Sequence, residues 1–84
     1  MHHIPKNALF CFKTAKGSFW IAPQPGSEGR FFLGFEDDAL GSFATPNDAA
    51  SDVASHMTGL GCWDAKPSLA SDPTDLGDWA RVSG

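Results

Sequence analysis

Two cysteines and a histidine are the residues of this chain whose types could support nucleophilic catalysis. His56 follows Asp52 by one helical turn, and an Asp-His pair of that spacing can orient an imidazole as a general base. Such a base beside Cys11 or Cys62 would generate the thiolate nucleophile of a cysteine-dependent enzyme. A helix-surface ion pair and two buried thiols explain the same residues. We therefore predict a protein without catalytic activity and keep the cysteine-dependent enzyme as a remote alternative.

Metal ligands are the second kind of chemistry that the sequence could offer. The acidic run at positions 36–38 carries carboxylates suited to a hard cation, but the apolar residues after it interrupt the ligand series of a calcium loop. His2 and His3 lie close to the first residue, far along the chain from His56. A solvated turn is the better interpretation of the acidic run. We expect neither a metal nor a cofactor.

Aromatic side chains form the third group, with seven Phe, three Trp and no Tyr. Exposed Trp is typical of interfaces, although in so small a domain packing in the core is the simpler interpretation of each indole. We name four residues as a candidate surface for a ligand or partner: Trp20, Phe32, Trp63 and Trp79. The leading prediction is a small binding or protein-interaction module whose partner is another protein or a second copy of the chain.

Alternating apolar residues predict the strands that position these side chains. Residues 8–13 and 18–22 alternate with strand parity on either side of a turn, so we expect them to form a hairpin. Residues 30–36 resume the pattern, and Gly34 marks a bulge or a close approach of another group to the backbone. Residues 40–44 form either a short fourth strand or an irregular run into the next element.

Strand parity divides the apolar side chains between the two faces of this sheet. Phe rings dominate the face that we expect to receive a helix. The opposite face carries Leu9, Cys11, Trp20 and Phe32. This opposite face is the predicted interaction surface wherever the C-terminal tail leaves it open.

One helix is predicted over residues 46–58. Thr45 can cap its free backbone N–H groups, Pro46 suits the first helical position, and Asp48 completes a capping box. Gly59 supplies the stop. A stripe of small apolar residues, mostly Ala, would let this helix pack closely on the Phe-bearing face of the sheet.

The tail repeats the same start signal. Residues 72–75, Asp-Pro-Thr-Asp, match the cap, Pro, polar and acidic pattern that precedes the first helix, and they predict a short helix over about 73–80. Leu76 and Trp79 would share one side of it. We expect this tail to cross the sheet face opposite the main helix.

Length and composition limit the architecture to one domain. The chain has 84 residues, of which 42% are hydrophobic, and such a composition is typical of a globular protein. We predict an α+β fold with a three- or four-stranded antiparallel sheet, one principal helix and a short C-terminal helix. The domain would span 1–84, with frayed ends at 1–7 and 81–84. No stretch is long enough to span a bilayer, and the start lacks the apolar core of a signal peptide, so we expect a cytoplasmic protein.

Charge distribution bears on nucleic acids and membranes. The net charge of −4 disfavours both as partners, because they attract concentrated Lys and Arg. The basic residues nevertheless gather in the N-terminal part and the acids in the remainder. Nucleic-acid binding through the sheet is therefore the alternative function, with Lys13, Lys16 and Arg30 as its candidate contacts.

Two resemblances agree with this fold. Residues 32–35 (FLGF) and 41–50 (GSFATPNDAA) resemble the AP2 and integrase amino-terminal type of DNA-binding domain, in which an LG-x-F strand precedes T-x-x-acid-A-A at a helix start. The likeness covers about residues 10–58 and implies a three-strand-plus-helix fold that reads the DNA major groove through Arg and Trp on the sheet. The whole chain, with Trp63-Asp64 and residues 75–79, is similar to small bacterial α+β proteins of unknown function. That likeness implies a fold and no activity.

Overall fold

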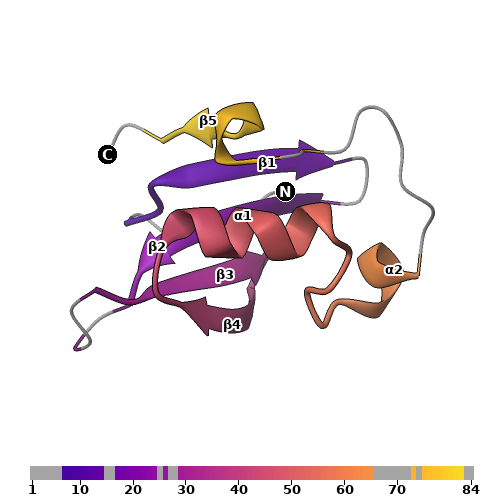
Figure 1. Ribbon diagram of the computed structural model, residues 1–84, viewed down its shortest axis with the longest axis horizontal. Coiled ribbons are helices and arrows are strands. Elements are labelled where there is room, and N and C mark those ends of the chain that lie inside the picture. Colours follow the sequence, from indigo (N-terminus) through magenta and orange to yellow (C-terminus); the bar gives the residue numbers. More distant parts are fainter. Residues whose placement is uncertain are drawn as a thin grey trace.

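An antiparallel sheet with one main helix across it forms most of the described chain (Figure 1). The computed structural model describes residues 7–14, 17–24, 26, 29–65, 73 and 75–82. In chain order its elements are β1 (Phe10–Thr14), β2 (Gly17–Pro23), β3 (Phe31–Phe35), β4 (Asp38–Phe43), α1 (Pro46–Ala54), α2 (Gly61–Asp64), the 3-10 helix η1 (Leu76–Asp78) and β5 (Ala80–Arg81). The predicted α+β class and its single principal helix are confirmed.

The strands lie in the order β4-β3-β2-β1-β5, and every neighbouring pair is antiparallel. β1 to β4 are therefore neighbours in the sheet in the order of the chain, which is a meander, the simplest topology of sequential antiparallel strands. β4 is a full strand, so the irregular alternative for residues 40–44 was wrong. β5 adds a further strand on the free edge of β1, where Arg81 lies opposite Phe10. The described sheet therefore has five strands, where the sequence predicted three or four.

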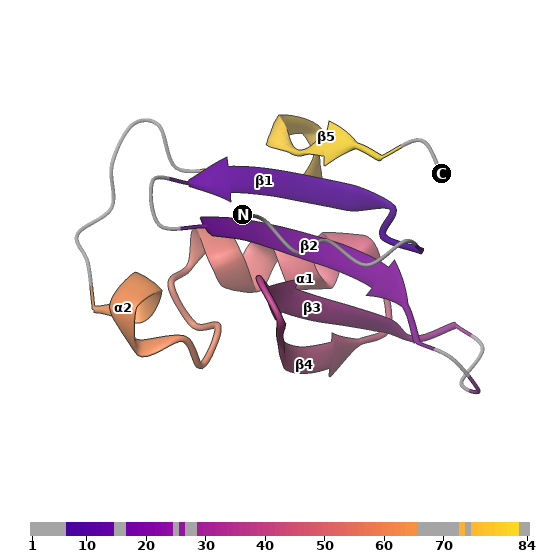
Figure 2. The same cartoon turned by 180° about the vertical axis from the view of Figure 1, so that it is seen from behind.

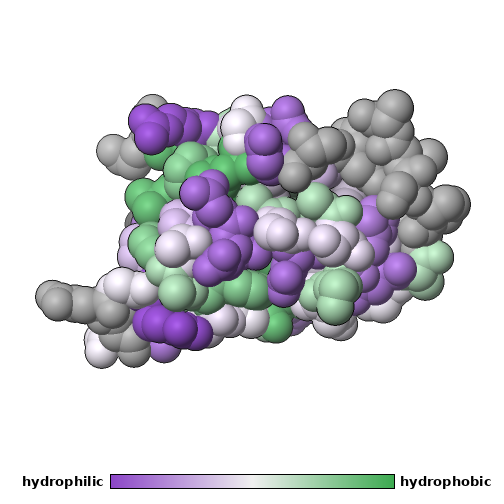
Figure 3. Space-filling model, in the orientation of Figure 1, coloured by the Kyte–Doolittle hydropathy of each residue, from purple (hydrophilic) through white to green (hydrophobic). Residues whose placement is uncertain are grey.

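The main core lies between the sheet and α1. Phe19, Ile21 and Leu33 are fully buried in it. α1 contributes only small buried side chains to this contact: Ala49, Ala50 and Val53. Burying each of the larger side chains contributes about 1.5–3 kcal/mol. Small residues on the helix and large ones on the sheet let the two layers approach closely, and hydrophilic residues cover the outward side of α1 (Figure 3).

The start of α1 agrees with the prediction. The side-chain oxygen of Thr45 accepts a hydrogen bond from the backbone N–H of Asp48 at 3.1 Å, and Pro46 occupies the first turn. This cap satisfies one of the backbone donors that every helix start leaves unpaired. The local sequence therefore determines where the helix begins.

The end of α1 differs from the prediction, because the helix stops at Ala54 and does not continue to residue 58. The backbone N–H of His56 donates to the carbonyl of Val53 at 3.2 Å, and that of Met57 donates to the carbonyl of Asp52 at 2.9 Å. These two bonds form a Schellman motif, which requires a left-handed residue at the first position beyond the cap. His56 takes that conformation with φ 56°, which makes it an unusual substitute for glycine.

The tail also differs from its prediction. The helix expected over 73–80 is replaced by the short η1 and by β5. Asp75 caps η1 by accepting a hydrogen bond from the N–H of Gly77 at 2.8 Å. Trp79 packs in the core on the α1 side, and β5 pairs with the edge of β1, so of residues 75–82 it is Val82 that packs against the opposite face. One residue beyond β5, the N–H of Val82 donates to the carbonyl of Leu9 at 2.9 Å.

Candidate partner-binding face

The sheet face opposite α1 is the surface that strand parity predicted as the interaction surface. No helix of the described residues lies in front of it in the view from behind (Figure 2). Strand register and packing place the following described side chains on this face, which we call the outer face: Ala8, Cys11, Lys13, Ser18, Trp20, Ala22, Arg30, Phe32 and Val82. Within β1, β2 and β3 the alternation follows the predicted parity.

Two cross-strand rows make up the middle of the outer face. In the first row, Ala22 on β2 lies opposite Phe32 on β3, and Ala8 before β1 packs in one buried group with Trp20 and Ala22. Ala8 and Ala22 are buried, whereas Phe32 is half-buried. Leu9, which follows Ala8, donates its N–H to the carbonyl of Ile21 at 2.8 Å and is 39% exposed at the border of this face. Phe32 and Leu9 therefore keep apolar surface accessible beside a packed group.

The second row centres on Trp20, which lies between Cys11 on β1 and Gly34 on β3. A Cβ atom at position 34 would overlap the indole ring, so Trp20 lies directly over the glycine backbone. The indole Nε1 donates to the carbonyl of Glu36 at 2.8 Å. Gly34 therefore serves the close approach that its position in the sequence predicted. Trp20, only 6% exposed, forms a fixed base of the outer face.

Glu36 holds this arrangement from the turn between β3 and β4. Its carboxylate accepts the N–H of Ser18 at 2.8 Å, and its own N–H donates to the carbonyl of Ser18 at 3.0 Å. Glu36 has φ 53°, a left-handed conformation that side chains other than glycine seldom adopt. The acidic run that the sequence treated as a solvated turn thus contains a residue with a defined structural role.

Trp63 and Trp79 lie on the other side of the sheet and meet at Phe19. Their ring centroids are 5.0 Å and 6.3 Å from that of Phe19. Trp63 is 5% exposed and its Nε1 donates to the carbonyl of Val53 at 2.9 Å. Trp79 is 6% exposed, and its Nε1 has no acceptor among the described residues. The three indoles therefore belong to two separate cores and do not form one exposed platform with Phe32.

The basic candidates do not gather in one place. Lys13 lies opposite Ser18 at the start of β2, whereas Arg30 precedes β3, whose first residue is opposite Pro23 at the end of β2. The Arg30 guanidinium donates to the hydroxyl and the carbonyl of Ser42 at 3.2 Å and 3.1 Å. Lys16 is outside the described residues. The structure thus places Lys13 and Arg30 at opposite ends of the sheet.

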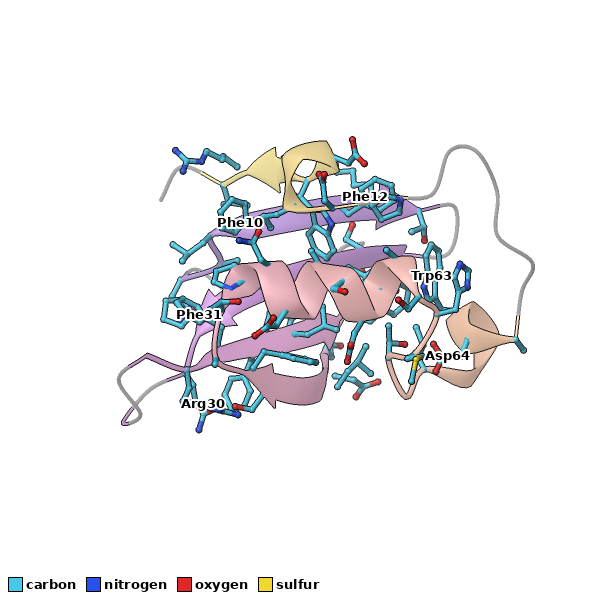
Figure 4. The ribbon with its side chains drawn as sticks, in the orientation of Figure 1. Phe10, Phe12, Arg30, Phe31, Trp63 and Asp64 are labelled. Atoms are coloured by element: carbon cyan, nitrogen blue, oxygen red, sulfur yellow. The ribbon has the colours of Figure 1, made fainter. Side chains whose placement is uncertain are left out.

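His56 and Cys11 are separated by the sheet. The His56 ring stacks on Trp63 with centroids 4.8 Å apart and planes 7° apart, and its Nδ1 lies 2.8 Å from the Trp63 carbonyl (Figure 4). Cys11, by contrast, is half-buried on the outer face. The structure does not bring these two candidates together, and the side chain of Cys62 lies outside its description. Within the described part of the chain, no three His, Cys, Asp or Glu residues are grouped as metal ligands.

Asp64 is a structured carboxylate that the sequence analysis missed. It accepts hydrogen bonds from the N–H and the hydroxyl of Thr58, both at 2.9 Å, and from the N–H of Gly59 at 2.8 Å. Partial burial raises the pKa of Asp64, but these hydrogen bonds and the nearby His56 outweigh it, so the net shift of the pKa is downward. In the sequence, the signal for this loop was Thr58-Gly59 shortly before Asp64. The hydrogen bonds that the Asp64 carboxylate accepts stabilise the loop after α1.

Comparison with models of known protein families, with curated proteins and with solved structures finds no match for this chain. Among the described residues, no helix is long and apolar enough to cross a membrane.

Proposed function

We propose that the protein is a small cytoplasmic binding module, without catalytic activity, that recognises a protein partner through the outer face. The observation that carries the proposal is the asymmetry of the sheet, since α1 covers one face while Phe32 on the other face, and Leu9 at its border, keep exposed apolar surface. Apolar side chains grouped over a rigid base are typical of interaction surfaces. The free thiol of Cys11 agrees with a reducing compartment.

The apolar surface of Phe32 also rests on a rigid base. Ala8, Trp20 and Ala22 beside it are buried, and the Trp20 indole is held by its hydrogen bond to the carbonyl of Glu36. A partner that binds on this preformed base needs no rearrangement of the backbone, so little conformational entropy is lost on the module's side of the complex.

A photo-crosslinking amino acid at position 9 tests this proposal against one at position 57. Among the described residues, Leu9 and Met57 are the two large hydrophobic residues with exposed side chains, at 39% and 70%, and Met57 is not on the outer face. In the cells that produce the protein, we expect a discrete crosslinked product from position 9 and none from position 57. Replacing Phe32 by Ser should reduce that product severalfold. Equal products at both positions, or none at position 9, would refute the proposal.

Nucleic acid is tested as the other outcome. Single-stranded and duplex DNA are titrated with the purified protein at low salt, and we expect no binding because Lys13 and Arg30 lie at opposite ends of the sheet. Salt-sensitive binding that is lost in Lys13→Ala and in Arg30→Ala would replace the protein partner by a nucleic acid.

A further inference from the structure

The outer edge of β4 is the longest strand edge that the described residues leave without a neighbour. β4 is the first strand in the sheet order and has six residues, Asp38–Phe43, whereas β5 at the other end has two. In an antiparallel ladder only alternate backbone groups point toward the neighbouring strand. The remaining N–H and C=O groups of β4 therefore face away from β3, along the lower border of the sheet in Figure 1.

Features that usually protect an edge strand are sparse in β4. Its sequence, DALGSF, contains no Pro, Lys or Arg. Ala39 and Ser42 are exposed and small, and Gly41 between them has no side chain, so another backbone can approach closely. The register shift opposite Leu33 and Gly34 bends the strand and is its one protective irregularity. Because Arg30 already binds the carbonyl of Ser42, the accessible part of the edge is the short stretch before that residue.

Charges of opposite sign mark the two ends of this edge. Asp38 begins β4 and is exposed. At the other end, the exposed Arg30 lies with its guanidinium on the hydroxyl and the backbone carbonyl of Ser42, which holds the positive charge at the level of the strand (Figure 4). β4 is therefore acidic where it starts and basic where it ends.

We propose that β4 pairs with β4 of a second copy of this chain in antiparallel orientation. Antiparallel pairing about a two-fold axis places the start of each strand beside the end of the other. Each Asp38 then approaches the Arg30 of the other copy, and both pairs form at once. Parallel pairing would bring like charges together, so the charge pattern selects the antiparallel arrangement and favours a second copy over an unrelated strand.

The dimer forms through backbone hydrogen bonds and two exposed ion pairs, and its interface is small. Exposed ion pairs contribute about 0.2–1 kcal/mol each and are screened by salt. We therefore expect weak, salt-sensitive association. The edge and the outer face share Arg30, but the pairing depends on the backbone of β4 and not on the apolar side chains of the face.

Sedimentation equilibrium of the purified chain at low and high salt tests the inference. We expect a monomer-dimer equilibrium that Arg30→Asp weakens about tenfold and that Asp38→Arg weakens to a similar extent. The double variant, with both charges exchanged, should recover dimerisation. Ala39→Lys, which places a charge on the edge, should also weaken the dimer, whereas Ala65→Lys adds the same charge at an exposed position outside the sheet and should not.

Three results would overturn the inference: a monomer at all concentrations, a dimer unaffected by Ala39→Lys, or single charge variants that the double variant does not rescue. Circular dichroism of each variant shows that the fold is retained. Since Arg30→Asp also removes the bonds to Ser42, the Ala39→Lys and Ala65→Lys pair decides the result if that variant is unfolded.

Discussion

The two faces of the sheet are built from the same strands, yet they bury their aromatic residues in different ways. On the α1 side, Phe19 is covered by a second layer and contacts the rings of Phe35, Trp63 and Trp79. On the outer face, Trp20 lies across the backbone of a glycine in its own sheet. Burial of Phe19 depends on a separate helix, α1, whereas burial of Trp20 depends on Gly34, which has no side chain.

Because of this difference, we expect the two faces of the sheet to contribute differently to folding stability and to binding. The α1 side has several aromatic rings in contact with one another, so the loss of one ring leaves a cavity in a packed core. The outer face has partly exposed apolar groups whose removal changes little inside the molecule. Stability should therefore reside mainly on the α1 side, and binding on the outer face.

The largest predicted effect is that of Phe19→Ala. It removes a fully buried ring at the centre of the main core, and it should lower the free energy of unfolding by about 3–5 kcal/mol. Phe32→Ala is the matched change on the outer face, and we expect a loss of about 1 kcal/mol because that ring is half-buried. Urea denaturation measures both. Equal losses would contradict the difference between the faces.

Gly34→Ala should have the next largest effect. The added methyl group would overlap the Trp20 ring and displace it from the sheet, at a cost of about 2–3 kcal/mol in the free energy of unfolding. Trp20 fluorescence should report increased solvent exposure. Gly61→Ala serves as the control, because nothing lies within 4 Å of the added atom, and it should leave stability nearly unchanged. If the two variants are equally stable, Trp20 does not rest on Gly34.

Asp64→Asn should cost about 1 kcal/mol at neutral pH, because an amide cannot accept all three hydrogen bonds that the carboxylate accepts. The sign of the pH effect follows from the lowered pKa of Asp64. The carboxylate contributes stability above its ordinary pKa of 3.8, and this contribution is lost as the pH falls through the lower pKa of the folded state. We therefore expect the free energy of unfolding to fall less between pH 7 and pH 2 in the variant than in the parent, and denaturation over this pH range measures both.

Leu9→Ser should have the smallest effect on stability, below about 0.5 kcal/mol, because its side chain is partly exposed. The same change should weaken partner binding by about tenfold if the outer face is the interface. Met57→Ser is the control, since it is more exposed and not on that face. Equal effects of the two changes on binding would show that recognition is not specific to the outer face.

Local sequence signals were reliable where neighbours in the chain make the interaction. The strand parity of β1 to β3 and the Thr45 cap of α1 were predicted correctly, since each depends on residues only a few positions apart. The end of α1 was not, because His56 is stacked on Trp63, seven residues away. The prediction for the tail was wrong for a related reason, because β5 pairs with β1, which lies near the other end of the chain.

The sequence by itself determined the α+β class, the start of the helix and the side of the sheet on which each strand residue lies, because all three follow from short-range periodicity and capping. The tertiary structure decided which of the described side chains are buried and which strand lies at the edge. It placed Trp63 and Trp79 in the core, laid Trp20 over Gly34 and left β4 at the edge of the sheet. These outcomes depend on contacts between elements that are far apart in the chain. Because hydrophobic burial is non-directional, no short stretch of sequence specifies which of these elements come into contact.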